Sequence, residues 1–158
     1  MARHFNFDQI RTRFPELKRK LLIGLGKQAQ NYFFKSFKDQ GFDGQKWEEV
    51  KRRIPGTKAY EYPKTKGFQR RTSPILVGAG YEKRGVTLAK AVSTMSQTAS
   101  FSGNTQIKMQ VNVPYSGYLN EGTDKMPKRQ FVGQTDRLTD MQRKRIIKTV
   151  DEVFGIKA

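Results

Sequence analysis

Cysteine is absent from this sequence, and histidine and tryptophan occur once each. A chain without cysteine forms no disulfides and no cysteine-ligated metal site. The single histidine, His4, lies near the N-terminus, so a serine–histidine–aspartate arrangement would require this one residue to reach a distant pocket. Long apolar runs are also missing, because no stretch approaches the roughly 20 apolar residues that a membrane span needs.

Acidic residues are scarce, with 14 Asp and Glu against 31 Lys and Arg. They are scattered, and the adjacent pairs Glu48-Glu49 and Asp151-Glu152 would diverge on a helix, which favours solvated surface over an acid–base or metal-binding cluster. The segment Gly78-Ala79-Gly80 is typical of a tight turn, since no Gly-Lys-Ser/Thr follows it as in a phosphate-binding loop. We therefore expect no enzymatic activity, no cofactor and no metal site.

The net charge of +17 predicts an anionic partner, which is nucleic acid, an acidic protein surface or an anionic membrane. The N-terminal MARHFNFDQI lacks the apolar stretch of a signal peptide, which favours synthesis in the cytoplasm. The apolar fraction of 35 % is below the usual globular value. Part of the chain is therefore expected to lie in an exposed arm or to become buried only against other subunits.

Residues 7–39 are expected to form a long helix. Apolar residues recur there at steps of three and four, which places on one face Phe14, Leu17, Leu21, Leu22, Leu25, Ala29, Tyr32, Phe33 and Phe37. Pro15 either opens the main helix after a short turn or kinks it, and Gly24 and Gly26 leave room for another backbone. A glycine of the segment 40–44 (QGFDG) is expected to end the helix in a left-handed conformation.

A long basic arm, residues 51–75, follows and shows no persistent helical or strand period. Irregular connections of this length are often functional. Its cations are Lys51, Arg52, Arg53, Lys58, Lys64, Lys66, Arg70 and Arg71, and its aromatic residues are Tyr60, Tyr62 and Phe68. The arm either neutralises phosphates and stacks its rings on bases, or docks on an acidic neighbouring subunit. Just before it, Phe42 and Trp47 are predicted to pack the helix exit onto the core, with an intersubunit contact as the alternative for Trp47.

The remaining sequence predicts a small antiparallel sheet. Residues 83–92 fit a short helix or an edge strand. Residues 93–101 and 105–113 fit two strands around a turn at 102–104, because apolar and polar residues alternate in the second of them.

A second helix is predicted at the C-terminal end. Residues 115–121 fit one helical turn, followed by a polar loop and a short extended segment. Residues 135–153 fit an amphipathic helix capped by Thr135 or Asp136, with an inner side formed by Leu138, Met141, Arg145, Ile146, Thr149, Val150 and Val153. The expected fold is α+β, a single domain over 1–158 with a long N-terminal helix, a small antiparallel β-sheet and a C-terminal helix.

Three stretches carry a family resemblance. Residues 37–50 (FKDQGFDGQKWEEV) combine a helix end, a glycine-containing turn and a Trp-led segment. Residues 73–92 (SPILVGAGYEKRGVTLAKAV) contain leucine, glycine, and again leucine with a small hydrophobic pair, interrupted by an apparent insertion around 80–85. The most specific stretch is 113–133 (VPYSGYLNEGTDKMPKRQFVG). Together they resemble the phage virion morphogenesis family, the tail-completion proteins of Mu-like and P2-like phages, which belong with the neck proteins of long-tailed phages.

In the third stretch, the family's pattern is Tyr-Ala, His-Glx-Gly, a loop, and Met/Ile-Pro-Ala-Arg-Pro-Phe-Leu-Gly. The residues here that correspond to this motif loop are Tyr115, Asn120, Glu121, Gly122, Met126, Pro127, Arg129, Phe131 and Gly133. Asn120 stands in place of the commoner histidine, and Gln130 in place of the commoner proline.

Elementary chemistry assigns roles within this motif loop. Gly122 permits a sharp exit from the preceding turn, and Pro127 stiffens the loop. Arg129 is placed to bind carbonyls or a carboxylate, on its own or a neighbouring subunit. Phe131 is expected to anchor the extended segment in the core. A loop that merely leads into the last helix and an intersubunit contact remain equally open.

The resemblance implies a structural head–tail joining subunit of a virion, made in the bacterial host cytoplasm. It implies a homo-oligomeric ring around the DNA channel, a hexamer being favoured over a dodecamer, in contact with connector or stopper and tail terminator proteins. Non-specific contact with genomic DNA in the channel is compatible with it, and no membrane contact is expected. The alternative is a free basic nucleic-acid-binding protein without sequence specificity, since no DNA-reading motif is present.

Overall fold

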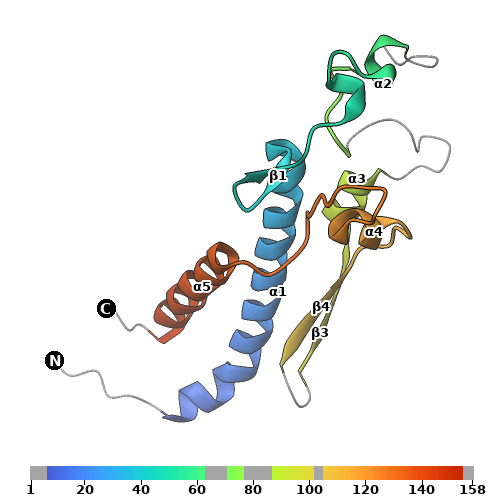
Figure 1. The fold of residues 1–158 in the computed structure, drawn as a ribbon. Coiled ribbons are helices and arrows are strands. Elements are labelled where there is room, and N and C mark those ends of the chain that lie inside the picture. Colours follow the sequence, from blue (N-terminus) through green and yellow to red (C-terminus); the bar gives the residue numbers. More distant parts are fainter. Residues whose placement is uncertain (1–6, 63–70, 77–86, 102–104, 155–158) are drawn as a thin grey trace. The chain divides into compact units, whose positions relative to one another are not determined.

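The computed structural model describes residues 7–62, 71–76, 87–101 and 105–154 (Figure 1). In chain order its elements are α1 (Phe7–Asp39), β1 (Gly41–Phe42), β2 (Gln45–Lys46), the 3-10 helix η1 (Lys51–Arg53), α2 (Lys58–Glu61), α3 (Leu88–Ser93), β3 (Ser96–Ser100), β4 (Gln106–Gln110), α4 (Ser116–Glu121) and α5 (Asp136–Phe154). β1 pairs with β2 and β3 pairs with β4 in two small antiparallel sheets. The predicted α+β class, with its long N-terminal helix and its C-terminal helix, is confirmed.

Contacts divide the chain into two compact units. The first unit combines Met1–Ala29, Gln97–Met109 and Gln134–Ala158, and the second unit combines Gln30–Ser96 and Gln110–Gly133. The boundary falls inside α1, so this helix contributes residues to both units. The single domain over 1–158 stays a prediction, because two compact units can still fold as one cooperative body.

In the first unit, the small residues of α1 lie beside side chains of α5 and β4. A Cβ added at Gly24 would stand 2.8 Å from the guanidinium of Arg145, and one added at Gly26 would collide with the Ile107 side chain. The two glycines therefore let side chains of other elements approach the α1 backbone, whereas the sequence suggested the approach of another backbone. Pro15 lies within α1, which is helical from Phe7 onwards, so residues 7–14 belong to the same helix and form no separate turn before Pro15.

Helix α5 begins as predicted, with Thr135 as its N-cap. The Thr135 hydroxyl oxygen accepts a hydrogen bond from the Leu138 amide at 3.1 Å, and Leu138 is only 1 % exposed. The predicted inner side is wrong for Met141 and Ile146, which are exposed, whereas the guanidinium of the exposed Arg145 does lie beside α1 at Gly24. The described part of the first unit buries few apolar residues, namely Leu17, Leu22, Ala29 and Leu138, and it leaves most of this helix face uncovered.

The second unit holds the larger apolar core. Its residues less than a tenth exposed include Phe33, Phe37, Phe42, Trp47, Ile75, Leu88, Val92, Met95, Val113 and Phe131. The predicted burial of Phe42 and Trp47 at the helix exit is confirmed. A polar contact crosses this core, because the side-chain amide of Gln30 donates to the carbonyl of Ser93 at 2.7 Å.

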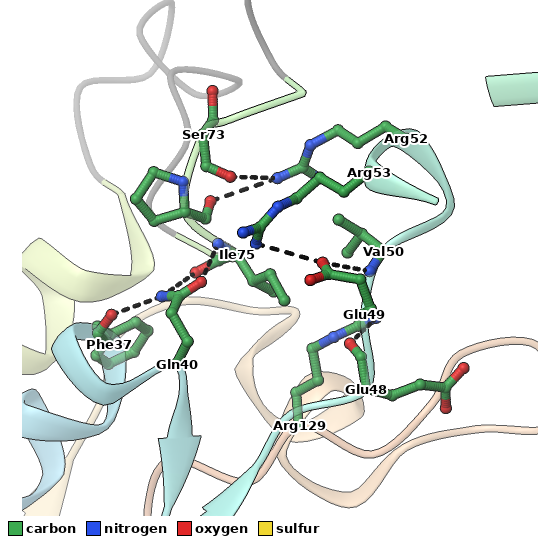
Figure 2. A network of polar contacts seen from close by, with 11 residues as sticks. Phe37, Gln40, Glu48, Glu49, Val50, Arg52, Arg53, Ser73, Ile75 and Arg129 are labelled. Carbon is green, nitrogen blue, oxygen red and sulfur yellow. Dashed lines mark hydrogen bonds and ion pairs between the residues drawn. The ribbon is translucent and has the colours of Figure 1, made fainter. Parts of the chain in front are cut away.

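Helix α1 ends at Asp39 as expected, but by another means than glycine. Gln40 itself takes the left-handed conformation, with φ of 51°. Its side chain donates to the carbonyls of Phe37 at 2.6 Å and Ile75 at 3.3 Å and accepts a hydrogen bond from the Ile75 amide (Figure 2). These bonds explain why a non-glycine residue is tolerated there. The β1–β2 hairpin that follows was not predicted, since two-residue strands show no alternation.

The basic arm is partly folded, so the prediction of an irregular segment is wrong for η1 and α2. Both elements are single turns held by local bonds, such as the hydrogen bond from the Gly56 amide to the Glu61 carboxylate at 3.0 Å. Single turns have no apolar period that the sequence could display. Residues 63–70 of the arm lie outside the described part of the chain.

For residues 83–92 the sequence allowed a short helix or an edge strand. The described part of this segment forms a helix, α3. Thr87 caps α3, since its hydroxyl oxygen accepts a hydrogen bond from the Lys90 amide at 3.2 Å. The two predicted strands are confirmed as β3 and β4 and are shorter than expected, and the helical turn is confirmed as α4. The segments 83–86 and 102–104 lie outside the described residues.

Candidate functional site

The motif loop is fastened by the side chain of Asn120 at the end of α4. Its oxygen accepts hydrogen bonds from the amides of Phe131 at 3.0 Å and Val132 at 3.1 Å. Its nitrogen donates to the Glu121 carboxylate at 2.7 Å. Asn120 therefore satisfies two backbone amides of the extended segment and at the same time orients a surface carboxylate.

Gly122 makes the sharp exit that the sequence predicted. Its φ is 79°, and a Cβ at this position would stand 2.9 Å from the backbone nitrogen of Lys128. The close approach brings the two ends of the loop together around the turn between Thr123 and Met126, whose backbones exchange hydrogen bonds at 2.9 and 3.0 Å. A side chain at residue 122 would therefore be strained in conformation and crowded by backbone.

Arg129 is a largely buried cation, with 9 % of its surface exposed. Its guanidinium donates to the carbonyl of Glu48 at 3.2 Å (Figure 2), and its backbone amide donates to the carbonyl of Leu119 at 2.9 Å. Of the two acceptors that the sequence allowed, a carbonyl is the one observed. Because the carbonyl belongs to the segment after β2, Arg129 ties the motif loop to the exit of α1.

Phe131 anchors the same segment in the core of the second unit, as predicted. It is 1 % exposed, and its ring lies 5.6 Å from that of Phe37. Trp47 also packs on Phe37, with a centroid distance of 5.6 Å, and donates from its indole nitrogen to the Gln130 carbonyl at 2.7 Å. The extended segment is thus held by one buried ring and one buried indole donor.

Of the other motif residues, some shape the backbone and others lie at the surface. Tyr115 stands at the N-cap of α4 without a side-chain cap bond, Pro127 is partly exposed, and an added Cβ at Gly133 would meet only the flexible side chain of Gln130 and the Phe42 ring. Glu121 is exposed, and Met126 is 40 % exposed.

Tyr118 is 62 % exposed and lies close in sequence to Glu121 and Met126. It is not among the site residues predicted from the sequence. A tyrosine inside a helical turn gives no sign of which way it faces. The outward side of this region therefore offers apolar atoms and carboxylates to a partner.

In the described part of the basic arm, Arg52, Arg53 and Arg71 each form contacts within the chain. Arg52 donates to the carbonyl of Ser73 at 3.2 Å, and Arg53 pairs with the Glu49 carboxylate at 3.3 Å (Figure 2). The Arg71 guanidinium lies 3.9 Å above the ring centre of Tyr60. These cations therefore hold the folded part of the arm together and are less available for phosphates than the sequence suggested.

The two described lysines of the arm and one aromatic residue face solvent. Lys51 and Lys58 are exposed, and Tyr62 is 81 % exposed. This is the part of the predicted contact set that an anionic partner can reach. The other predicted arm contacts, which are Lys64, Lys66, Phe68 and Arg70, lie outside the described residues.

A hollow in the first unit was not predicted. It has a volume of about 310 Å³ and is lined by Phe14, Pro15, Lys18, Arg19 and Phe101. Phe14 was expected on the inner face of α1 but is 53 % exposed. Its ring and that of Phe101, which is 41 % exposed, give the hollow an apolar lining.

Within the described ranges, no group of three or more metal-ligating side chains comes together. In the same part of the chain, no helix has the length and apolar character that crossing a membrane requires. His4 and the segment 78–80 lie outside it.

Comparisons of the chain with protein-family models, with curated proteins and with solved structures return no match. The family resemblance therefore rests on the three sequence stretches alone.

Proposed function

We propose that this chain is a structural head–tail joining subunit, a neck or tail-completion protein of a tailed bacteriophage virion, which forms a ring around the DNA channel and catalyses no reaction. The observation that carries the proposal is the number of large apolar side chains left exposed in both units. In the first unit they are Phe14, Ile23, Phe101, Met141, Ile146 and Ile147, and in the second they are Phe34, Ile54, Tyr62, Tyr118 and Met126.

Exposed apolar side chains are normal when they are single and scattered. Here three of them, Phe14, Ile23 and Ile147, are more than half exposed and belong to one unit. Covering each would contribute roughly 1 kcal/mol, about half the value for burying a whole large side chain. Subunits of a ring meet through two different patches, and apolar residues on two separate units supply them.

The motif loop supports the same proposal. Its buried members, Arg129 and Phe131, hold the segment rigidly, while Glu121 and Met126 remain at the surface. A rigid loop with a mixed apolar and charged surface is suited to a repeated contact, because little side-chain order has to be gained on binding. The neighbours proposed are further copies, connector or stopper proteins and the tail terminator.

The basic arm suits the lining of a channel or an acidic neighbour. Lys51 and Lys58 carry exposed charges, and the exposed ring of Tyr62 is available for stacking. In a channel, these cations would contact phosphates without reading sequence.

The experiment is to measure the mass of the purified chain by light scattering over a range of concentrations and to image the particles. A mass that is a multiple of the 18.2 kDa subunit, with closed rings in the images, is the expected result, a hexamer being favoured. A chain that stays monomeric alone but joins a purified tail terminator also supports the proposal. A monomer that joins no virion component overturns it.

The second candidate is a free nucleic-acid-binding protein without sequence specificity, favoured by the +17 charge and the exposed lysines of the arm. Retention on duplex DNA across a salt series separates the two. A monomer with a steep fall of affinity as salt rises favours this candidate, since the slope counts the phosphates neutralised. An assembled ring with a shallow slope favours the neck subunit.

A further inference from the structure

The hollow in the first unit combines apolar walls with a cationic rim. Two aromatic rings and Pro15 form its apolar surface, and Lys18 and Arg19 complete the lining. We call this site the cationic hollow. It is defined by its five lining residues, Phe14, Pro15, Lys18, Arg19 and Phe101. Its volume of about 310 Å³ lies at the lower end of the range of ligand pockets, roughly 300–1,000 Å³, which suits a few side chains of a protein.

The rim cations have no anionic partner within the described chain. Neither Lys18 nor Arg19 forms an ion pair with a described carboxylate. Long cationic side chains commonly lay their aliphatic stems along apolar surface and keep the charge in water. An occupant of the cationic hollow should therefore present an apolar side chain next to carboxylates.

The second unit carries a surface of that chemistry. We call Tyr118, Glu121, Asp124 and Met126 the acidic lobe. Tyr118 and Met126 are 62 % and 40 % exposed, and both carboxyl residues are exposed. Lys125 and Lys128 are exposed in the same segment and balance the two carboxylates in number, so the match depends on where the carboxylates are placed and not on the net charge of the segment.

The acidic lobe is also rigid. The Asn120 side chain holds Glu121 at 2.7 Å. The Thr123 hydroxyl oxygen accepts a hydrogen bond from the Met126 amide at 3.1 Å, which fixes the turn that carries Asp124. Groups held in place lose little freedom on docking.

We propose that the acidic lobe of one copy docks into the cationic hollow of the next copy, with apolar side chains entering the hollow and the two carboxylates facing its rim. This inference rests on the proposed function, since it names the contact that would close the ring. The contact joins two different surfaces of the same chain, as a head-to-tail ring requires. Duplex DNA would meet the rim cations but would leave the aromatic rings wet, because its bases are already stacked on one another, so a protein occupant is favoured.

The test uses two charge-reversed variants of the full chain. The hollow variant carries Lys18→Glu and Arg19→Glu, and the lobe variant carries Glu121→Lys and Asp124→Lys. In each variant like charges meet across the contact, so the concentration at half assembly should rise at least about tenfold. Circular dichroism should stay unchanged and the melting temperature nearly so, because Arg19, Glu121 and Asp124 are exposed and Lys18 is half-buried.

Mixing the two variants gives the sharper result. The reversed hollow of the first fits the reversed lobe of the second, and the unaltered lobe of the first fits the unaltered hollow of the second. An equimolar mixture should therefore assemble at nearly the wild-type concentration, with the copies alternating in a ring of even number. Native mass spectrometry of an isotope-labelled partner detects the alternation.

Matched controls are the variant Arg13→Glu/Lys20→Glu, on the same helix but outside the hollow, and Glu48→Lys/Asp140→Lys, outside the lobe. Both should assemble like the wild type. A wild type that forms rings while the hollow and lobe variants assemble equally well overturns this inference alone. A wild type that forms no ring, either alone or with a purified tail terminator, overturns the ring and this contact together. Loss of DNA retention by the hollow variant, without loss of assembly, would assign the rim to nucleic acid and likewise overturn the inference.

Discussion

Asn120 illustrates how single side chains position this molecule's surface. Its oxygen satisfies two backbone amides, and its nitrogen holds the Glu121 carboxylate. A buried amide that is left without an acceptor costs about 1–3 kcal/mol, so the residue stabilises the loop as well as shaping it. The resembling family commonly has histidine at this position, and asparagine here supplies an acceptor and a donor in one side chain.

Phe131 should be the most costly of the motif residues to truncate. Its side chain is 1 % exposed and packs on Phe37, so Phe131→Ala should lower the free energy of unfolding by roughly 3–5 kcal/mol. Phe34→Ala, at a position 39 % exposed, is the control and should cost about 1 kcal/mol or less. Denaturant titration of both variants measures the difference. Equal losses would show that the ring of Phe131 is not an anchor.

Gly122 and Gly117 form a natural pair for a second measurement. Gly122→Ala forces a Cβ into a conformation with φ of 79° and against the Lys128 backbone, so it should destabilise the chain by about 1–3 kcal/mol. Gly117 lies in α4 and has open space around an added Cβ. Gly117→Ala should therefore be neutral or stabilise the chain by up to about 1 kcal/mol. Thermal unfolding of the two variants tests the contrast, and a similar response at both positions would contradict it.

The burial of a residue could be predicted from the sequence where its size and apolar character alone decided it. Phe42, Trp47 and Phe131 are large and apolar, and all three are buried as expected. The role of Gln40 could not be predicted, because its left-handed backbone is supported by bonds to Ile75, 35 positions away.

Among the elements, the helices with a sustained apolar period were the ones that could be predicted. α1 and α5 lie within a residue or so of their expected bounds. Repeated apolar spacing over several turns is a signal that accumulates along the chain. The single turns η1 and α2 lack this repetition and are held by bonds between particular side chains and backbone groups.

The arm should respond differently to the loss of its arginines and of its lysines. Replacing Arg52 and Arg71 with serine removes bonds to the Ser73 carbonyl and the stacking on Tyr60. Amide exchange in residues 51–62 should become roughly tenfold faster, equivalent to about 1.4 kcal/mol of local stability. Hydrogen-exchange mass spectrometry makes the measurement.

Replacing Lys51 and Lys58 with serine is the matched control and should leave exchange in the arm unchanged. Replacing all eight arm cations with serine should still leave the far-ultraviolet circular dichroism signal intact, because none of the arm cations that the structure describes belongs to the apolar core. Loss of that signal would show that the arm is part of the core.

At the scale of the whole molecule, the chain covers its apolar surface unevenly. The second unit buries the aromatic residues Phe33, Phe37, Phe42, Trp47 and Phe131, whereas α5 in the first unit has Leu138 as its one buried residue among those described. A fold that leaves one helix face uncovered gains stability when other copies or partners cover it.

Polar substitutions on this uncovered surface should separate assembly from folding. Ile23 and Ile147 are 55 % and 53 % exposed, so Ile23→Ser and Ile147→Ser should change the free energy of unfolding by about 0.5 kcal/mol or less. The same changes should weaken assembly about fivefold each, if roughly 1 kcal/mol of apolar burial is lost at the contact. Light scattering over a concentration series measures the assembly.

Ile75→Ser is the contrasting variant, because Ile75 is 3 % exposed and its loss should lower the melting temperature. If the two surface variants assemble as readily as the wild type, those isoleucines are outside the ring contacts.

Charge, the absence of cysteine, the α+β class and the long helices follow from composition and periodicity, because these properties are sums over many residues and need no knowledge of distant neighbours. The sharp turn at Gly122 and the loop after it could likewise be predicted from the sequence. The inward turn of Arg129, the use of the arm arginines within the chain and the hollow beside Phe14 could not. Each depends on groups far apart in sequence meeting at a few ångströms, and only the packed chain brings them together.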